Sequence, residues 1–314
     1  MRDALSIAMD ENALDCLVIG GGPAGLTAAI YLARFHLKVL VVDAGGGRAA
    51  QIPRSRNVPG FPDGISGAEL VALMRAQAER YGAAFADGRV TRLERSDDLL
   101  RAEWGEGPRA ARSLLLATGV RNRRPDVEEA LHDEALARGL LRYCPICDGF
   151  EVTDGKVAVI GDGTHGAAEA EFLRGYTADV TLIPPGADSG IAARERARLD
   201  ELGIALLAGP ARVAAIESDS ILIETAAGRH PFDSVYPALG SDIRNELAGQ
   251  IGARLAGDTG CILVDSHQRT SVSGVYAAGD VVIGLDQISH AMGEGGVAAT
   301  TIRNDLAKLR PLRR

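Results

Sequence analysis

The sequence predicts an α/β protein made of two three-layer (ββα/βα) domains, with the second domain inserted into the first. Two glycine-rich turns support this prediction, because each follows a short apolar strand and precedes a segment with helical apolar spacing. A third observation is that further strand-like segments follow residue 239, where the chain returns to the first domain. These patterns are typical of Rossmann-like nucleotide-binding domains. We therefore expect one domain to comprise 1–120 and 239–314, and the other to comprise 121–238.

The first glycine turn lies within a βαβ unit. Residues 15–20 and 38–42 predict buried strands, and helical spacing runs between them from Pro23 to about His36. In the turn, one glycine permits a tight bend, the next lets a pyrophosphate approach the backbone, and the last lets helix and strand pack closely. These three are Gly20, Gly22 and Gly25. Asp43 follows the second strand, at the position where a carboxylate can accept the ribose hydroxyls of an adenosine.

A polar loop, a helix and three strands complete the N-terminal part. The loop at 44–66 is rich in Gly, Pro and Arg, and Ser66 with Glu69 makes a capping box for a helix that ends near Tyr81. The strand-like segments are 90–94, 99–103 and 112–117. Residues 121–125 then read as a linker.

A second βαβ unit begins in the middle of the chain. Strand 156–160 enters the turn Gly161 to Gly166, which precedes a helix to about Tyr176 and a strand at 179–183. An alignment without gaps places Gly161, Gly163 and Gly166 on Gly20, Gly22 and Gly25. The same alignment places Pro184 at the position of Asp43. The second unit therefore lacks the carboxylate that would bind a ribose.

The rest of the chain reads as short strands and two helices. A charged helix is expected at 191–203, and the final helix at about 287–309 begins with small residues that would admit a ligand close to the backbone. The expected strands are 204–207, 213–217, 221–225, 232–236, 261–264 and 274–278.

Two cysteines form a Cys-x-x-Cys motif, Cys144-Pro145-Ile146-Cys147, directly before Asp148. This spacing allows either a small disulfide or two ligands of one zinc ion. The other cysteines, Cys16 and Cys261, have no nearby partner, so the sequence offers too few ligands for a four-ligand zinc site. We favour a redox disulfide and expect no metal site.

Charge and composition argue against several classes of function. The formal net charge of −8 and the pI near 5.4 argue against a nucleic-acid or anionic-membrane surface. No apolar run approaches the roughly 18 residues that cross a bilayer, and Met1–Asn12 has no signal-peptide core. We expect a cytoplasmic protein, in which a cysteine pair is catalytic more often than structural.

Together these motifs resemble the low-molecular-weight thioredoxin reductase family, the class II FAD-dependent pyridine nucleotide-disulfide oxidoreductases, from about Asp15 to Leu306. The resemblance implies that Cys147 faces the flavin and receives its electrons, that Cys144 attacks the partner's disulfide, and that Asp148 exchanges protons with these groups. A simpler interpretation of Asp148 is a helix cap after the disulfide loop. The FAD contacts that the resemblance implies are Gly20, Gly22, Pro23, Ala24, Gly25, Asp43, Gln51, Asn57, Val90, Ala117, Thr118, Gly119, Gly279, Asp280, Gln287 and Ile288.

The resemblance also implies a homodimer, hinges near 119–124 and 239–242, and a thioredoxin-like protein or a small-molecule disulfide or dithiol as partner. The electron donor is less well defined. Family members that use NADPH carry a run of cations after the second unit, whereas 184–190 reads Pro-Pro-Gly-Ala-Asp-Ser-Gly. NADPH or NADH is therefore doubtful, and Arg194, Arg196 and Arg198 read as a solvated helix face.

Three alternatives follow from this departure. A nucleotide could bind weakly at the second turn. The enzyme could work without pyridine nucleotides, as a disulfide reductase or as an O₂-dependent dithiol oxidase, although similar small-molecule oxidases often carry His at the position of Asp148. A flavin-binding redox sensor without turnover is the alternative from another class.

Overall fold

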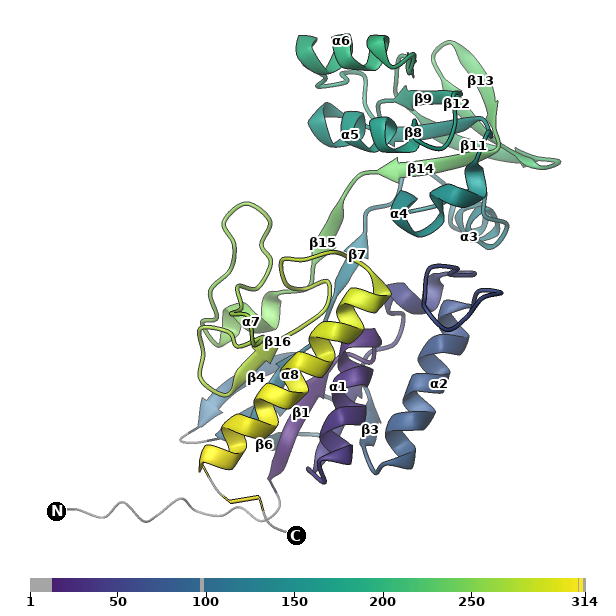
Figure 1. Cartoon of the computed structure of the whole chain (residues 1–314). Helices are drawn as coiled ribbons and strands as arrows, with labels where there is room; N and C mark the ends of the chain where they lie inside the picture. The colour runs from purple at the N-terminus through teal and green to yellow at the C-terminus, as the bar shows by residue number, and fades with distance from the viewer. Residues whose placement is uncertain (1–12, 97–98, 310, 313–314) are drawn as a thin grey trace.

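The computed structural model describes residues 13–96, 99–309 and 311–312, so Met1–Asn12, where no signal peptide was expected, lies outside the described residues. The chain forms two bodies, a larger one built from both ends of the sequence and a smaller one from its middle (Figure 1). Two strands connect the bodies. The predicted α/β class with two Rossmann-like units is confirmed.

A mixed sheet forms the centre of the larger body. Its order is β3-β2-β1-β6-β5-β4, with β16 also paired to β6. The neighbours from β3 to β6 run parallel, as does β16, whereas β4 and β5 form an antiparallel hairpin. The strands are β1 (Leu14–Ile19), β2 (Val39–Asp43), β3 (Ala84–Asp87), β4 (Arg92–Ser96), β5 (Leu99–Glu103), β6 (Arg109–Leu116) and β16 (Val275–Ala277).

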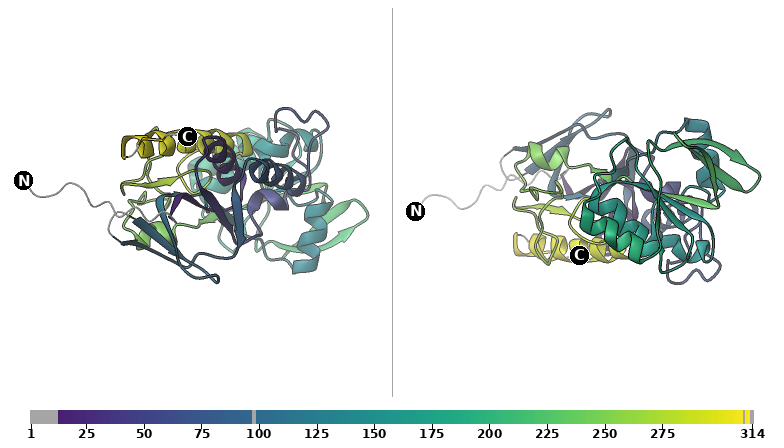
Figure 2. Two further views of the ribbon diagram at one scale, coloured as in Figure 1. Left: turned by 90° about the horizontal axis from the view of Figure 1, so that it is seen from below. Right: turned by 90° about the horizontal axis from the view of Figure 1, so that it is seen from above.

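Helices cover one face of this sheet. Figure 2 shows the last helix lying beside the first on the same side of the strands, and side chains from both helices share one apolar cluster with Val18, Val41 and Leu115. The opposite face packs against the hairpin, a short helix and the loops that precede β16. These helices are α1 (Pro23–Arg34), α2 (Gly67–Arg80), α7 (Glu246–Gln250) and α8 (Ile288–Leu309), with a 3₁₀ turn η1 (Arg48–Gln51).

The smaller body has a parallel sheet of order β10-β9-β8-β14 and a three-stranded antiparallel sheet, β11-β12-β13. Its strands are β8 (Val157–Gly161), β9 (Val180–Ile183), β10 (Ala205–Leu206), β11 (Arg212–Glu217), β12 (Ser220–Thr225), β13 (Gly228–Phe232) and β14 (Ser234–Ala238). Its helices are α3 (Glu129–Ala137), α4 (Pro145–Asp148), the 3₁₀ turn η2 (Gly149–Val152), α5 (Gly163–Leu173) and α6 (Ala193–Glu201).

Three sequence predictions are wrong in detail. The strand expected at 232–236 is two strands, because Asp233 binds Lys156 through both its backbone and its carboxylate where the chain changes sheets. The segment 261–264 makes isolated bridges only, since its neighbours there are loops. Val90 precedes β4 instead of lying within a strand. The strand β3 and the helices α3 and α7 were not predicted.

The two connecting strands pair with each other. β7 (Val120–Asn122) and β15 (Ser241–Ile243) run antiparallel, and Arg123 extends the pairing through a backbone hydrogen bond to Gly240. Figure 1 shows these strands rising side by side between the bodies. In the described ranges no helix is long and apolar enough to cross a membrane, and no cluster of three metal-ligating residues is found there.

Candidate functional site

The first glycine turn has two glycines whose small size is required by the protein itself. A Cβ on Gly20 would lie 2.2 Å from the carbonyl oxygen of Ala117, and a Cβ on Gly25 would lie 2.0 Å from the carbonyl oxygen of Gly20. Gly20 also has a φ of +111°, which side chains rarely adopt. These two glycines therefore let β1, α1 and the end of β6 meet.

Gly22 is different, because nothing in the protein requires a glycine there. Its backbone is extended, with φ −83° and ψ −176°, and no protein atom lies within 4 Å of an added Cβ. The space that a side chain would fill belongs to a cavity, next to the start of α1. Asp43 lies beside this space and accepts a hydrogen bond from the Gly21 N–H at 3.1 Å, which leaves its second oxygen free. This cradle fits the pyrophosphate and ribose of a dinucleotide.

The cavity has a volume of about 1250 Å³ and is lined by residues of both bodies. It brings together every candidate site residue except Gly25, which packs behind the turn. The members are Gly20, Gly22, Pro23, Ala24, Asp43, Gln51, Asn57, Val90, Ala117, Thr118, Gly119, Cys144, Cys147, Asp148, Gly279, Asp280, Gln287 and Ile288. One continuous site thus joins the first glycine turn, the Cys-x-x-Cys motif and the start of α8.

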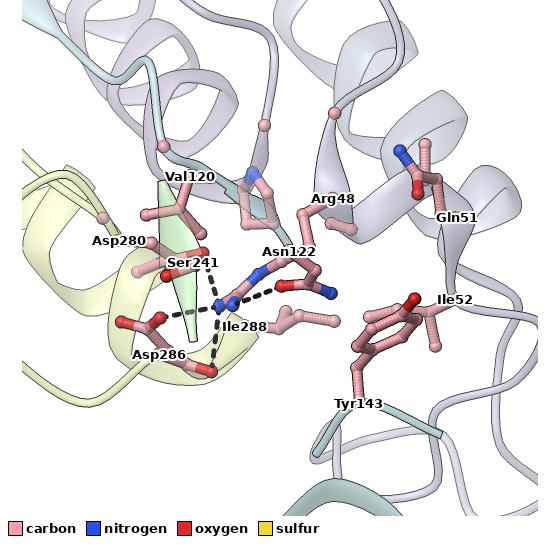
Figure 3. Close-up of a pocket in the computed structure, with 18 of the residues that line it drawn as sticks. Arg48, Gln51, Ile52, Val120, Asn122, Tyr143, Ser241, Asp280, Asp286 and Ile288 are labelled. Atoms are coloured by element: carbon pink, nitrogen blue, oxygen red, sulfur yellow. Dashed lines mark hydrogen bonds and ion pairs between the residues drawn. The ribbon is translucent and has the colours of Figure 1, made fainter. Parts of the chain in front are cut away.

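Arg48 is a central member of this site that the sequence analysis missed. Its guanidinium lies 2.7 Å from the Asp280 carboxylate and 3.2 Å from that of Asp286, and it donates to Asn122 at 3.4 Å (Figure 3). Burial raises the pKa of Asp280, and the positive charge of Arg48 opposes this shift. In the sequence, only its position directly after a run of three glycines could have drawn attention to Arg48. Its partners could not be predicted, because the ion pairs join residues separated by more than half the chain.

Cys144 and Cys147 form a disulfide, with their Cα atoms 5.3 Å apart. The amide nitrogen of Gln287, at the start of α8, lies 3.2 Å from Cys144 Sγ and 3.3 Å from Cys147 Sγ. Its amide oxygen accepts a hydrogen bond from Asn57, whose own oxygen accepts one from Ser55, both at 2.9 Å. Asn57 and Gln287, predicted as flavin contacts, therefore belong to a chain of hydrogen bonds that runs from Ser55 to the disulfide.

Asp148 is fixed on both sides of its carboxylate. Arg142 donates to one oxygen at 3.0 Å, and the hydroxyl of Tyr236 donates to the other at 3.0 Å. Burial raises the pKa of Asp148, and the neighbouring Arg142 opposes the shift. The simpler interpretation of Asp148 as a helix cap is wrong, because its side chain caps no backbone N–H of the turn that follows.

The second glycine turn packs like the first, but one of its backbone N–H groups already has a partner within the protein. A Cβ on Gly166 would lie 2.6 Å from the backbone of Gly161, as at the first turn. The N–H of Gly163, however, donates to the carbonyl oxygen of Ser189 at 2.8 Å. The loop 184–190 thus satisfies a donor that a pyrophosphate would otherwise use, and a nucleotide would have to compete with it.

Glu169 on α5 is a second residue that the sequence analysis missed. It lines the cavity that holds the disulfide, and its Oε1 is buried without a hydrogen-bond partner in the described residues. Burial raises the pKa of this carboxyl from 4.5 to about 7. The folded state therefore holds a proton that the unfolded chain has already lost between these two pH values.

We expect Glu169→Gln to change the pH dependence of stability. As the pH rises from about 4.5 to 7, the wild type should lose about 1–2 kcal/mol of unfolding free energy, a value discounted for partial exposure. The variant should keep that stability at pH 8 and match the wild type near pH 4.5. Urea denaturation between pH 4.5 and pH 8 measures the unfolding free energy of both proteins, with Glu171→Gln on the exposed face of α5 as control. Parallel wild-type and Glu169→Gln curves would contradict the expectation.

Known proteins resemble this chain over most of its length. The model of the family described as "Pyridine nucleotide-disulphide oxidoreductase" matches residues 14–295. A thioredoxin reductase of Streptomyces coelicolor is 33% identical over 281 residues, which cover 85% of this chain and 85% of the relative. One from Mycolicibacterium smegmatis is 34% identical over 293 residues, with 88% and 91% covered. The crystal structure of thioredoxin reductase from Streptococcus pyogenes MGAS5005 superposes with a TM-score of 0.85 at 27% identity, covering 95% of this chain and 99% of that chain.

Proposed function

Because the chain belongs to the pyridine nucleotide-disulphide oxidoreductase family and is a disulfide oxidoreductase of the thioredoxin reductase type, we propose that Cys144 and Cys147 pass electrons between FAD and an external disulfide. The observation that carries the proposal is that this disulfide and the first glycine turn line one cavity. The comparisons give no support to an O₂-dependent dithiol oxidase, to a reductase independent of pyridine nucleotides, or to a sensor without turnover.

We assign FAD to the part of the 1250 Å³ cavity that the larger body lines. The open cradle at Gly22 would hold its pyrophosphate, and the free oxygen of Asp43 would accept from its ribose. Asp280 and Gln287 would contact the flavin half. FAD supplies two-electron redox chemistry when it is bound. In this assignment 1–120 and 239–314 form the FAD-binding domain, and 121–238 form a nucleotide-binding-like domain that carries the cysteine pair.

The protein's own residues organise the exchange. Gln287 contacts both sulfurs, and this contact keeps the disulfide turned toward the FAD cavity. By resemblance, Cys147 accepts the electrons, and Cys144 becomes the thiolate that attacks the partner's disulfide. Asp148 is the proton-exchanging acid in this proposal. Burial raises the pKa of Asp148, and this shift favours the protonated form that a proton donor needs.

We propose a thioredoxin-like protein as the partner. Ile146, between the cysteines, and Phe150, just after Asp148, are large apolar side chains that are exposed, Phe150 by 78%. Exposed apolar groups beside a reactive disulfide are typical of a surface that contacts another protein. Such chemistry suits a reducing compartment, and we place the protein in the cytoplasm as a homodimer, the usual state in the family it resembles.

We propose a pyridine nucleotide as the donor, because the comparisons do not support the doubt about NADPH or NADH that the sequence raised. The loop 184–190 offers no cation to a 2′-phosphate, and in α6 the guanidinium of Arg198 is paired with Glu171 and Glu201. Each missing charge-assisted hydrogen bond to phosphate is worth about tenfold or more in affinity. We therefore expect NADPH and NADH to reduce the protein at rates within about tenfold of each other.

Anaerobic stopped-flow mixing tests the donor and the function together. The purified FAD-loaded protein is mixed with NADPH, with NADH or with dithionite as control, and bleaching of the visible flavin band is followed. A much larger preference for NADPH would mean that other residues bind the 2′-phosphate. Bleaching by dithionite alone would contradict a nucleotide donor. Failure of the reduced protein to reduce any disulfide would contradict the function itself.

A further inference from the structure

A second cavity, of about 540 Å³, lies where the two bodies join. This volume is in the range of about 300–1,000 Å³ that is usual for small-molecule sites. The larger body contributes Gln51, and the smaller body contributes His132 and Tyr143. The connecting strands and the residues that directly follow them supply most of the remaining lining. Its most distinctive feature is a set of five arginines: Arg48, Arg121, Arg123, Arg124 and Arg244.

The cavity has an excess of positive charge in a protein whose formal net charge is −8. Asp242 is the only acid among the described residues that line it, and it pairs with both Arg121 and Arg123. Arg48 is held by two aspartates from outside this cavity. Five arginines thus meet three carboxylates. The side chains of Arg124 and Arg244 have no ion pair or hydrogen bond in the described residues.

This cavity is connected to the disulfide. Tyr143 directly precedes Cys144 and lines both cavities, as do Arg48, Gln51 and Asn122. The hydroxyl of Tyr143 is held 2.9 Å from Nε2 of the buried His132, which fixes the wall between the arginines and the cysteine pair. A small molecule that occupied the arginine-lined cavity would therefore lie beside the residue that leads into Cys144.

We propose that this arginine-lined cavity binds carboxylate groups of a small disulfide, so that the enzyme reduces acidic low-molecular-weight disulfides as well as a protein partner. Guanidinium groups match carboxylates geometrically, because they donate two parallel hydrogen bonds, and the two unpaired arginines are the groups available for this contact. The inference rests on the proposed disulfide chemistry of Cys144 and Cys147.

The test uses three disulfides of similar length: the dianion 3,3′-dithiodipropionate, its neutral diamide and the dication cystamine. FAD-loaded protein is reduced stoichiometrically with dithionite, and its reoxidation by each disulfide is followed anaerobically, which removes any dependence on the natural donor. We expect the dianion to half-saturate the rate at about tenfold lower concentration than the diamide, with cystamine weaker still. High salt should reduce this preference.

In Arg124→Gln and in Arg244→Gln, the half-saturating concentration of the dianion should rise to near that of the diamide. The control Arg196→Gln, which removes one exposed charge from α6, should keep the full preference for the dianion. Suberate, a dicarboxylate without sulfur, should compete in the wild type and not in the variants. Flavin content checks that each variant is folded. Equal half-saturation by all three disulfides, or a preference that survives both cavity variants, would overturn the proposal and leave the disulfide chemistry intact. Reoxidation by none of them, while a thioredoxin-like disulfide still reoxidises the protein, would also overturn the proposal, whereas reoxidation by neither kind of disulfide would contradict the proposed function.

Discussion

Cys147→Ser will keep its FAD and lose disulfide turnover. The cysteine is one half of the disulfide, and serine can neither close that bond nor carry the electron pair. The cradle at Gly22 and Asp43 lies elsewhere in the cavity and is unchanged, so flavin binding should persist. We expect turnover of a thioredoxin-like substrate to fall by at least about 10³-fold, as is usual when a reacting nucleophile is removed. Flavin absorbance after gel filtration and steady-state turnover measure the two properties separately.

Cys261→Ala is the matched control for this experiment. Cys261 is a free cysteine, buried outside the cavity, so its replacement tests whether the loss of a thiol outside the Cys-x-x-Cys motif affects turnover. Turnover in this variant should equal that of the wild type. Undiminished turnover in Cys147→Ser would show that electrons bypass the Cys-x-x-Cys motif, and loss of flavin in that variant would show that the cysteine has a structural role in the cavity.

The two βαβ units were predictable because they depend on local patterns. In β1, α1 and β2 the apolar residues have the spacing typical of strands and helices, and a glycine turn joins β1 to α1. The second unit repeats this pattern. The close contact of Gly25 with Gly20 explains why the last glycine of the pattern is needed, although it does not line the site. The Cys-x-x-Cys motif was equally local, so its pairing could be anticipated without the fold.

The features that were missed depend on contacts between distant segments. Arg48 meets Asp280 across more than 200 residues, and no periodicity carries that information. Glu169 looks like an ordinary helix residue until the fold buries its oxygen without a partner. The contact between Ser189 and Gly163 depends on loop geometry, which apolar spacing does not determine. The short strand β3 and the misjudged 261–264 segment likewise depend on which neighbours a strand finds.

Gly22→Val should produce a folded protein without flavin. The extended backbone of Gly22 accepts a β-branched residue, and an added Cβ meets no protein atom within 4 Å. We expect the unfolding free energy of the flavin-free protein to change by less than about 1 kcal/mol. The side chain would nevertheless fill the cradle and displace the pyrophosphate. Loss of two charge-assisted hydrogen bonds of about 1.5–3 kcal/mol each lowers affinity by about 100-fold or more.

Variants at two further glycines distinguish a protein that has lost only its flavin from one that has lost stability. Gly257→Val, at an open position outside the cavity, should retain both flavin and stability. Gly25→Ala forces a Cβ against the Gly20 carbonyl and should lose about 1–3 kcal/mol of stability together with its flavin. Calorimetric titration of the flavin-free variants with FAD, beside their urea denaturation, distinguishes these patterns. If Gly22→Val kept its flavin, the dinucleotide could not lie in the cradle of the first turn, and the second turn would then have to release the Gly163 N–H from Ser189 to hold it.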